Sequence, residues 1–143
     1  MSVEIVLKNE AFHFEGHGEN GALINIDGSK KIGGQDKGPT PMELLLLGAA
    51  GCSSIDVLSM LRKQRQNIEN FKVTVDYKRI PNGEASQFKT ITLNFHIQGD
   101  VDPKKAKRAI NLSFEKYCSV SIILSHTATI DYTLIINHKI FNQ

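Results

Sequence analysis

Hydrophobic and polar positions alternate along the first 26 residues of the chain. One face of an extended strand in VEIVLKNEAFHFEGHG would hold Phe12 and Phe14, and the opposite face His13, Glu15 and His17. The segment GALINID follows a turn region at residues 18–21. This pattern predicts two or three antiparallel strands joined by tight turns. The glycine- and lysine-rich segment 28–38 that follows indicates an exposed, mobile loop.

The pattern changes at residue 40, where an apolar helix is expected to begin. Thr40 is a good N-cap, Pro41 suits the first helical position, and Glu43 stands where a capping box needs its acceptor. The run 44–50 is apolar all round, which is typical of a helix buried on every side. Polarity returns after this run, and the helix is expected to end near Gln64.

Alternation returns in the second half of the chain, at 71–80 and 87–99. The turn signal PNGE between these segments predicts a long hairpin. Asp102 and Pro103 then begin a second helix. Its apolar stripe at helical spacing comprises Ala106, Ile110, Phe114 and Tyr117. A short helical piece, CSVSIILSH, and a final strand, ATIDYTLIIN, complete an α+β fold in which helices pack against antiparallel sheet.

Length and composition indicate one ordinary globular domain over residues 1–143. The hydrophobic fraction is 41%, the charged fraction 22%, and the formal net charge +2. The basic clusters at 62–65 and 104–108 are interpreted as solvated helix faces, because no aromatic residues interleave with them to stack on bases. We therefore expect no nucleic-acid partner.

The N-terminus lacks the basic segment and long apolar stretch of a signal peptide. The most apolar run, 44–50, is shorter than the roughly 18 residues of a membrane span. We therefore expect a cytoplasmic protein with no membrane partner. In that compartment the two cysteines are expected to be buried filling, part of a metal site or a redox pair, since standing disulfides are rare there.

The two cysteines have different predicted surroundings. Cys52 lies about three turns into the apolar helix, beyond the reach of its N-terminal dipole, and burial there would raise its pKa. Cys118 stands where one helix ends and another begins, and free N–H groups at a helix start favour a thiolate. Cys118 is thus the better thiolate candidate and Cys52 the better-shielded thiol. Two unrelated core cysteines are the alternative.

The histidines make a weaker case for chemistry. His13, Glu15 and His17 have period-two spacing, and such a set can bind a transition metal. No fourth ligand and no helical metal motif accompanies them, so a solvated strand face is favoured and neither a metal nor a cofactor is predicted. The remaining histidines are isolated in the sequence: His96, His126 and His138.

Two segments, PTPMELLLLGAAGCSSIDVL at 39–58 and KYCSVS at 116–121, resemble the family of osmotically inducible protein C and the organic hydroperoxide resistance proteins (OsmC/Ohr). The order of strands and helices also fits over essentially all of 1–143. The resemblance implies an OsmC-like fold, with antiparallel sheets packed around a long central helix. It also implies an intertwined homodimer with two active sites at the subunit interface.

For function, the resemblance implies a thiol-dependent peroxidase that reduces organic hydroperoxides in oxidative stress defence. By position, Cys52 matches the peroxidatic thiol of the family and Cys118 the resolving thiol. Cys52 would form a sulfenic acid and then a Cys52–Cys118 disulfide, which a cellular dithiol would reduce. The two cysteines are expected to meet in the dimer. The alternative is a small-ligand-binding or redox-sensing module on the same fold, without efficient peroxidase activity.

The sequence departs from the family pattern at the groups that activate the central thiol. The family's arginine comes from the N-terminal hairpin, but no arginine precedes Arg62. Met42 occupies the position of the family's glutamate, and Glu43, one residue later, is a shifted candidate activator that the capping box explains equally well. The candidates to replace the arginine's charge are Lys30, Lys31 and Lys37. The match is nearest to the less characterised branch with GPxPMELLL.

Overall fold

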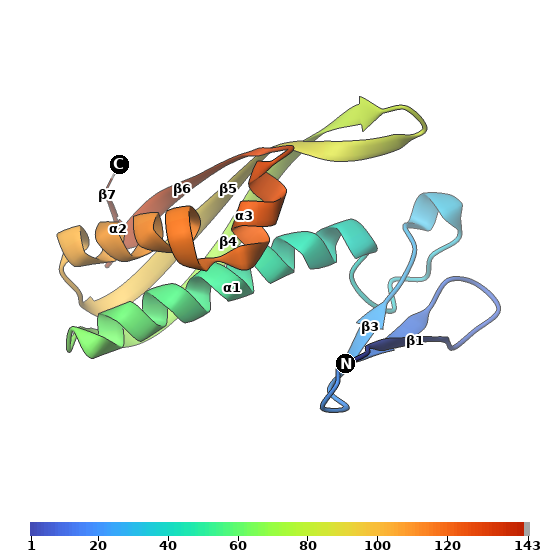
Figure 1. The fold of residues 1–143 in the computed structure, drawn as a ribbon, viewed down its shortest axis with the longest axis horizontal. Coiled ribbons are helices and arrows are strands. Elements are labelled where there is room, and N and C mark those ends of the chain that lie inside the picture. Colours follow the sequence, from blue (N-terminus) through green and yellow to red (C-terminus); the bar gives the residue numbers. More distant parts are fainter. Residues whose placement is uncertain (142–143) are drawn as a thin grey trace. The chain divides into compact units, whose positions relative to one another are not determined.

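The fold is that of a computed structural model that describes residues 1–141 (Figure 1). Contacts between residues divide the chain into two compact units, unit 1 (Met1–Leu45) and unit 2 (Leu46–Gln143). The α+β class is confirmed, and the element order contains every predicted strand and helix. That 1–143 form a single domain stays a prediction.

Unit 1 is built on a three-stranded antiparallel sheet with little core of its own. The strands are β1 (Glu4–Leu7), β2 (Phe14–His17) and β3 (Leu23–Ile26), in the order β1-β2-β3. Among residues 1–45, all of which the structure describes, only Gly16 and Asp27 are buried. Several large apolar side chains of this sheet are exposed instead: Ile5, Val6, Leu7, Leu23 and Ile24.

The loop at 28–38, expected to be mobile, is organised around the buried carboxylate of Asp27. Its oxygens accept the backbone N–H groups of Gly28 at 2.7 Å, Gln35 at 3.0 Å and Lys37 at 3.1 Å. The loop also contains a short 3₁₀ turn, η1 (Lys30–Ile32). Burial disfavours the ionised Asp27, but the three N–H groups outweigh burial and lower the pKa of this carboxyl.

Asp27→Asn is expected to loosen the loop. The amide keeps one acceptor oxygen and presents an NH₂ group to N–H donors, so backbone amides of Gln35 and Lys37 should exchange with solvent at least about tenfold faster. The wild-type loop should behave in the same way in acid. Because the folded pKa lies below the unfolded value of 3.8, the stabilisation is complete above that value and is lost as the pH falls through the folded pKa.

Hydrogen exchange read by NMR or mass spectrometry provides the measurement. Asp36→Asn is the matched control, because Asp36 is exposed and, among residues 1–141, its side chain makes only a surface ion pair with Lys30. Equal exchange rates in the wild type and in Asp27→Asn would show that the carboxylate does not hold the loop.

The central helix is α1 (Pro41–Lys63), and its predicted capping box is confirmed. Thr40 N–H donates to Glu43 Oε2 at 2.8 Å, and Glu43 N–H donates to Thr40 Oγ1 at 3.4 Å. The prediction that this helix is buried on every side is wrong for the single chain. The buried positions form one face, while Leu47 is 55% exposed and Ile55 70% exposed on another.

By length and composition alone, α1 could cross a membrane, with 23 residues and a mean hydropathy of 1.8 over its most apolar window. The apolar part of this helix is therefore longer than the run 44–50 identified from the sequence. The core helix of a soluble protein passes the same test. The buried face of α1, about a third of this window, consists of Leu46, Ala49, Ser53, Val57 and Leu61.

Unit 2 contains a four-stranded sheet in the order β4-β5-β6-β7. The predicted hairpin is confirmed as β4 and β5, which are longer than expected. The β6 strand pairs with β5 in parallel, which corrects the expectation of a wholly antiparallel sheet. The strands are β4 (Asn67–Asn82), β5 (Ala85–Asp100), β6 (Thr129–Ile136) and the unpredicted β7 (Lys139–Phe141).

The core of unit 2 lies between this sheet and its helices. Figure 1 shows α1, α2 (Pro103–Leu112) and α3 (Ser119–Ser125) on one face of the sheet. Alternate residues of the central strand β5 are buried, because their side chains point to one face. These residues are Ile91, Leu93, Phe95 and Ile97.

The segment between α2 and α3 determines where Cys118 lies. Asp102 caps α2 as predicted, accepting the N–H of Lys104 at 2.9 Å. After α2 the chain makes a π-helical turn, η2 (Ser113–Tyr117), in which Cys118 N–H donates to Ser113 O at 2.7 Å. A π turn holds one residue more than an α turn and shifts the register. The predicted stripe therefore ends before Tyr117, which is 53% exposed.

Candidate functional site

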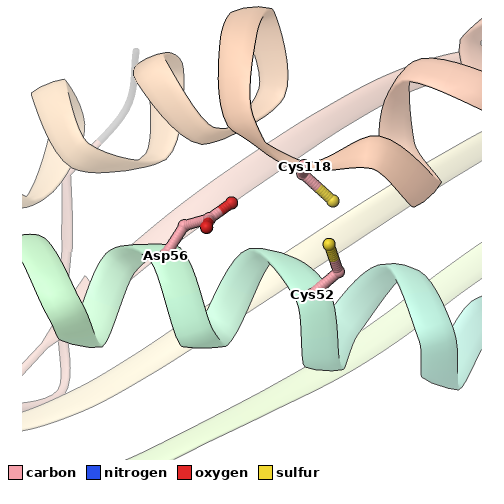
Figure 2. Close-up of side chains that lie close together, drawn as sticks. All are labelled: Cys52, Asp56 and Cys118. Atoms are coloured by element: carbon pink, nitrogen blue, oxygen red, sulfur yellow. The ribbon is translucent and has the colours of Figure 1, made fainter.

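The two cysteines lie close together within one chain. Cys52 projects from α1, and Cys118 lies at the start of α3, with both sulfur atoms directed toward one another (Figure 2). Their Sγ atoms and a carboxylate oxygen of Asp56 all lie within 4.8 Å of one another. The two cysteines were expected to meet in the dimer. The structure adds that unit 2 of a single chain is sufficient to bring them together.

Local structure explains the position of Cys118. The π turn ends at Cys118, whose backbone is extended, and α3 begins at the next residue. Cys118 is thus the N-cap of α3, and its sulfur accepts the N–H of Ser121 at 3.3 Å. π turns are frequent at functional sites, and this one directs Cys118 toward α1.

Hydroxyl groups surround the sulfur of Cys118. The Oγ atoms of Ser121 and Ser53 lie 3.0 Å and 3.4 Å from it. Burial disfavours the thiolate, but hydrogen bonds from these hydroxyls and from the Ser121 N–H outweigh burial and lower the pKa of Cys118. The prediction that Cys118 is the better thiolate candidate agrees with this environment.

Cys52 has the opposite electrostatic environment. Burial raises the pKa of Cys52; a hydrogen bond from the Val120 N–H opposes this, and the neighbouring Cys118 and Asp56 add to the increase. Cys52 was predicted to be the thiol better shielded from solvent, and in the single chain the order is reversed. Cys118 is fully buried, whereas Cys52 is partly exposed and is the thiol that a solute reaches first.

Sequence reasoning missed Asp56 as a member of this site. It lies four residues after Cys52, and residues at this spacing share one face of a helix. Ser113 Oγ, from the π turn, donates to Asp56 Oδ2 at 2.8 Å. The four-residue spacing from Cys52 could have indicated Asp56 as a neighbour of the thiol. The sequence did not show that the π turn would pack against α1 at this point.

Two of the other candidate activators, Glu43 and Lys30, are engaged elsewhere. Glu43 accepts hydrogen bonds from the N–H and hydroxyl of Thr40 in the capping box. Lys30 pairs with Asp36 at 2.7 Å, and this pairing raises the pKa of Lys30. An activating role for Glu43 or for a loop lysine stays a prediction.

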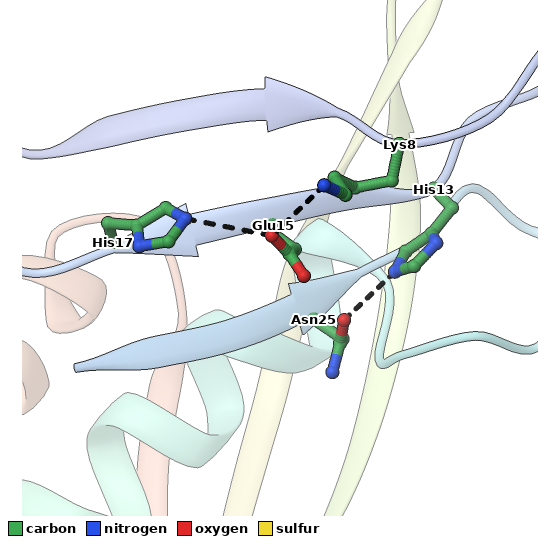
Figure 3. A network of polar contacts seen from close by, with 5 residues as sticks. All are labelled: Lys8, His13, Glu15, His17 and Asn25. Atoms are coloured by element: carbon green, nitrogen blue, oxygen red, sulfur yellow. Dashed lines mark hydrogen bonds and ion pairs between the residues drawn. The ribbon is translucent and has the colours of Figure 1, made fainter. Parts of the chain in front are cut away.

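The histidine hypothesis gains no support. Glu15 is within 3.5 Å of Lys8 and 3.8 Å of His17, while His13 lies 2.9 Å from Asn25 (Figure 3). Within residues 1–141, the only group of three potential metal ligands this close together is Cys52, Asp56 and Cys118. These residues form a polar network on a face of the sheet.

Comparison with known proteins identifies the family. The family model described as OsmC-like protein matches residues 34–133, more than half of the chain. The chain belongs to the OsmC-like family. Protein YhfA of Escherichia coli K12, another member by similarity, is 38% identical over 126 residues, which cover 87% of this chain and 90% of YhfA.

Solved structures agree with the OsmC-like fold. A hypothetical protein from Aquifex aeolicus is 30% identical with a TM-score of 0.77, over 95% of this chain and 96% of that protein. An organic hydroperoxide resistance protein, OsmC, from Legionella pneumophila has a TM-score of 0.68 over 93% of this chain and 94% of its own. At 16% identity, the latter likeness concerns the fold alone.

Proposed function

We propose that this OsmC-like protein is a two-cysteine peroxidase that reduces organic hydroperoxides. The proximity of the Cys52 and Cys118 sulfur atoms carries the proposal, because a short movement would let them close a disulfide. The family supports it, since structural neighbours from Legionella pneumophila and Elizabethkingia anophelis are named organic hydroperoxide resistance proteins.

Cys52 is the proposed peroxidatic thiol because it is the more exposed of the two. Its proton would pass to the Cys118 thiolate beside it, an uphill transfer because the pKa of Cys52 is raised and that of Cys118 is lowered. The Cys52 thiolate would attack the peroxide, breaking the O–O bond to leave a sulfenic acid and an alkoxide, which is protonated to the alcohol. Cys118, deprotonated again, would attack the Cys52 sulfur and release water once the departing hydroxide is protonated.

The net reaction converts two thiols and one hydroperoxide into a disulfide, an alcohol and water. A cellular dithiol would then reduce the disulfide by thiol–disulfide exchange and become oxidised itself. The hydroxyl groups that lower the pKa of Cys118 make it a ready nucleophile for the resolving step.

The test is a thiol count with peptide mapping. Reduced protein, with a metal chelator present, is mixed with a slight excess of cumene hydroperoxide or of hydrogen peroxide and quenched over seconds. We expect rapid loss of both thiols and a Cys52–Cys118 linked peptide, formed faster with the organic peroxide. Thiols that remain unchanged after minutes would contradict the proposal.

A second candidate function is a redox-sensing or ligand-binding module on the same fold. The raised pKa of Cys52 and the engagement of Glu43 in the capping box favour it, because both leave the thiol weakly activated. In that case the same experiment should show slow disulfide formation with no preference between the two peroxides.

We also propose a homodimer. Leu47, Gly51 and Ile55 form an exposed stripe on α1 at intervals of four residues. A Cβ atom at Gly51 would meet nothing within 4 Å, so a partner helix could approach closely there. Unit 1 adds a sheet with almost no buried side chains, and such a sheet needs further packing to be stable.

Ile55→Asp is expected to dissociate this dimer. Transfer of a carboxylate into an apolar interface is unfavourable, so the dissociation constant should rise at least about a hundredfold. Light scattering coupled to gel filtration measures the mass against the 15.9 kDa of one chain. Ser59→Asp, one turn beyond this stripe at an exposed polar position, is the matched control and should leave the dimer intact. A wild-type monomer, or an Ile55→Asp protein that remains dimeric, would contradict the proposal.

A further inference from the structure

We propose that the reduced protein binds a thiophilic divalent cation of the Zn²⁺ class through Cys52 Sγ, Cys118 Sγ and a carboxylate oxygen of Asp56. This binding uses the same two thiols as the proposed peroxidase, but it does not require that the protein be a peroxidase. The three donor atoms come from α1 and from the start of α3, and all lie within 4.8 Å of one another (Figure 2).

The ligand set suits Zn²⁺. Thiolate sulfur and carboxylate oxygen are both common zinc ligands, and three protein ligands leave a fourth tetrahedral position for water. A Zn–S distance of about 2.3 Å places two sulfur ligands about 3.8 Å apart in a tetrahedral site. Contraction by roughly 1 Å or less would therefore form the site.

A second layer of groups orients these ligands. Ser113 Oγ donates to Asp56 Oδ2 at 2.8 Å, which fixes the carboxylate and leaves Oδ1 available. Ser53 and Ser121 hold the sulfur of Cys118. Hydrogen bonds to metal ligands of this kind commonly strengthen binding, because they fix the ligands in position.

The carboxylate is reached from the surface. A cavity of about 320 Å³ borders Asp56 but neither sulfur atom, so it gives access to the carboxylate side of the site. The cavity is lined by Asp56, Ser59, Met60, Lys63, Leu112 and Tyr117, of which Lys63 is a cation.

The sulfur atoms of Cys52 and Cys118 that would bind the metal are also those that would form the disulfide. Metal binding and the disulfide therefore exclude one another.

Cadmium is the probe for the test, because thiolate-to-cadmium charge transfer absorbs in the ultraviolet. Titration of the reduced protein with Cd²⁺ should give this band with one ion per chain, and Zn²⁺ should displace it. Cys52→Ser and Cys118→Ser should each weaken binding at least about a hundredfold, since each removes a thiolate ligand. Asp56→Asn should weaken it at least about tenfold.

Asp56→Asn retains the oxygen that accepts from Ser113, so the fold should be preserved. Asp76→Asn is the matched control, because it removes an exposed carboxylate on β4 that, within the described part of the chain, is bonded only to the Asn94 amide. It should bind Cd²⁺ like the wild type. A further measurement needs no variant: saturating Zn²⁺ should slow alkylation of both thiols by iodoacetamide at least about tenfold.

Absence of the charge-transfer band in the reduced wild type would overturn the proposal. Equal affinity of Asp56→Asn and the wild type would also overturn it, by showing that the carboxylate is not a ligand, as would unprotected thiols in excess Zn²⁺. The peroxide assay contains a chelator, so failure of one proposal is distinguishable from failure of the other.

Discussion

Replacement of Cys52 by serine should abolish turnover of organic hydroperoxides, with a fall in rate of at least about a thousandfold. A serine hydroxyl is a far weaker nucleophile toward peroxide oxygen than a thiolate, and no other thiol of the chain is as exposed as Cys52. Cys118→Ser should behave differently. It should consume one equivalent of peroxide and then stop, because the sulfenic acid at Cys52 has no resolving thiol.

The measurement combines peroxide consumption with dimedone labelling, which traps sulfenic acids. We expect a dimedone adduct at Cys52 in Cys118→Ser and none at Cys118 in Cys52→Ser. Ser119→Ala, at the exposed first residue of α3, is the control and should retain full activity. The reverse result, an adduct at Cys118 in Cys52→Ser, would exchange the two roles and match the lowered pKa of Cys118.

Phe95→Ala should have the largest effect on stability, a loss of about 3–5 kcal/mol in the free energy of unfolding. Phe95 is fully buried on the central strand β5. Its ring centroid lies 6.1 Å from that of Phe71, 6.5 Å from Phe114 and 6.4 Å from Tyr132. Truncation would leave a cavity that strands and helices border together, and such a cavity does not collapse fully.

Urea unfolding of the wild type and the variant measures this loss. Ile140→Ala is the control, because Ile140 is 64% exposed and its truncation should change the free energy by less than about 1 kcal/mol. A loss below about 1 kcal/mol for Phe95→Ala would contradict the packing of this core. Because Phe114 belongs to the π turn, the variant should also close the Cys52–Cys118 disulfide more slowly.

The sequence predicted those features that local chemistry determines. Thr40, Pro41 and Glu43 located the start of α1, and Asp102 located the start of α2, because capping depends on neighbouring residues only. Alternation located β4 and β5. The direction of the pKa contrast between the cysteines was also predictable from the position of each thiol relative to a helix start, but the hydroxyls of Ser121 and Ser53, which contribute more to it, were not.

The features that were missed depend on pairing between distant segments. The direction of β6 follows from the crossover through α2 and α3, whereas alternation carries no information on direction. The π turn has no signature in SFEKY, and Asp56 became part of the site only because that turn brings Ser113 and Cys118 to α1. The exposed face of α1 was missed because apolar composition does not show whether one chain or two cover a helix.

The π turn before Cys118 also restricts how the length of the chain can vary. Loss of one residue between Ser113 and Tyr117 would restore a regular α turn and rotate everything after it by about 100°. Loss of one residue from each of the paired strands beside the turn, at Asn82 and Ala85, would only shorten a hairpin and keep its register. Such paired deletions should therefore be tolerated at the tip of β4 and β5, whereas even a single deletion should be selected against between α2 and α3, where the count of residues sets the direction of the thiol.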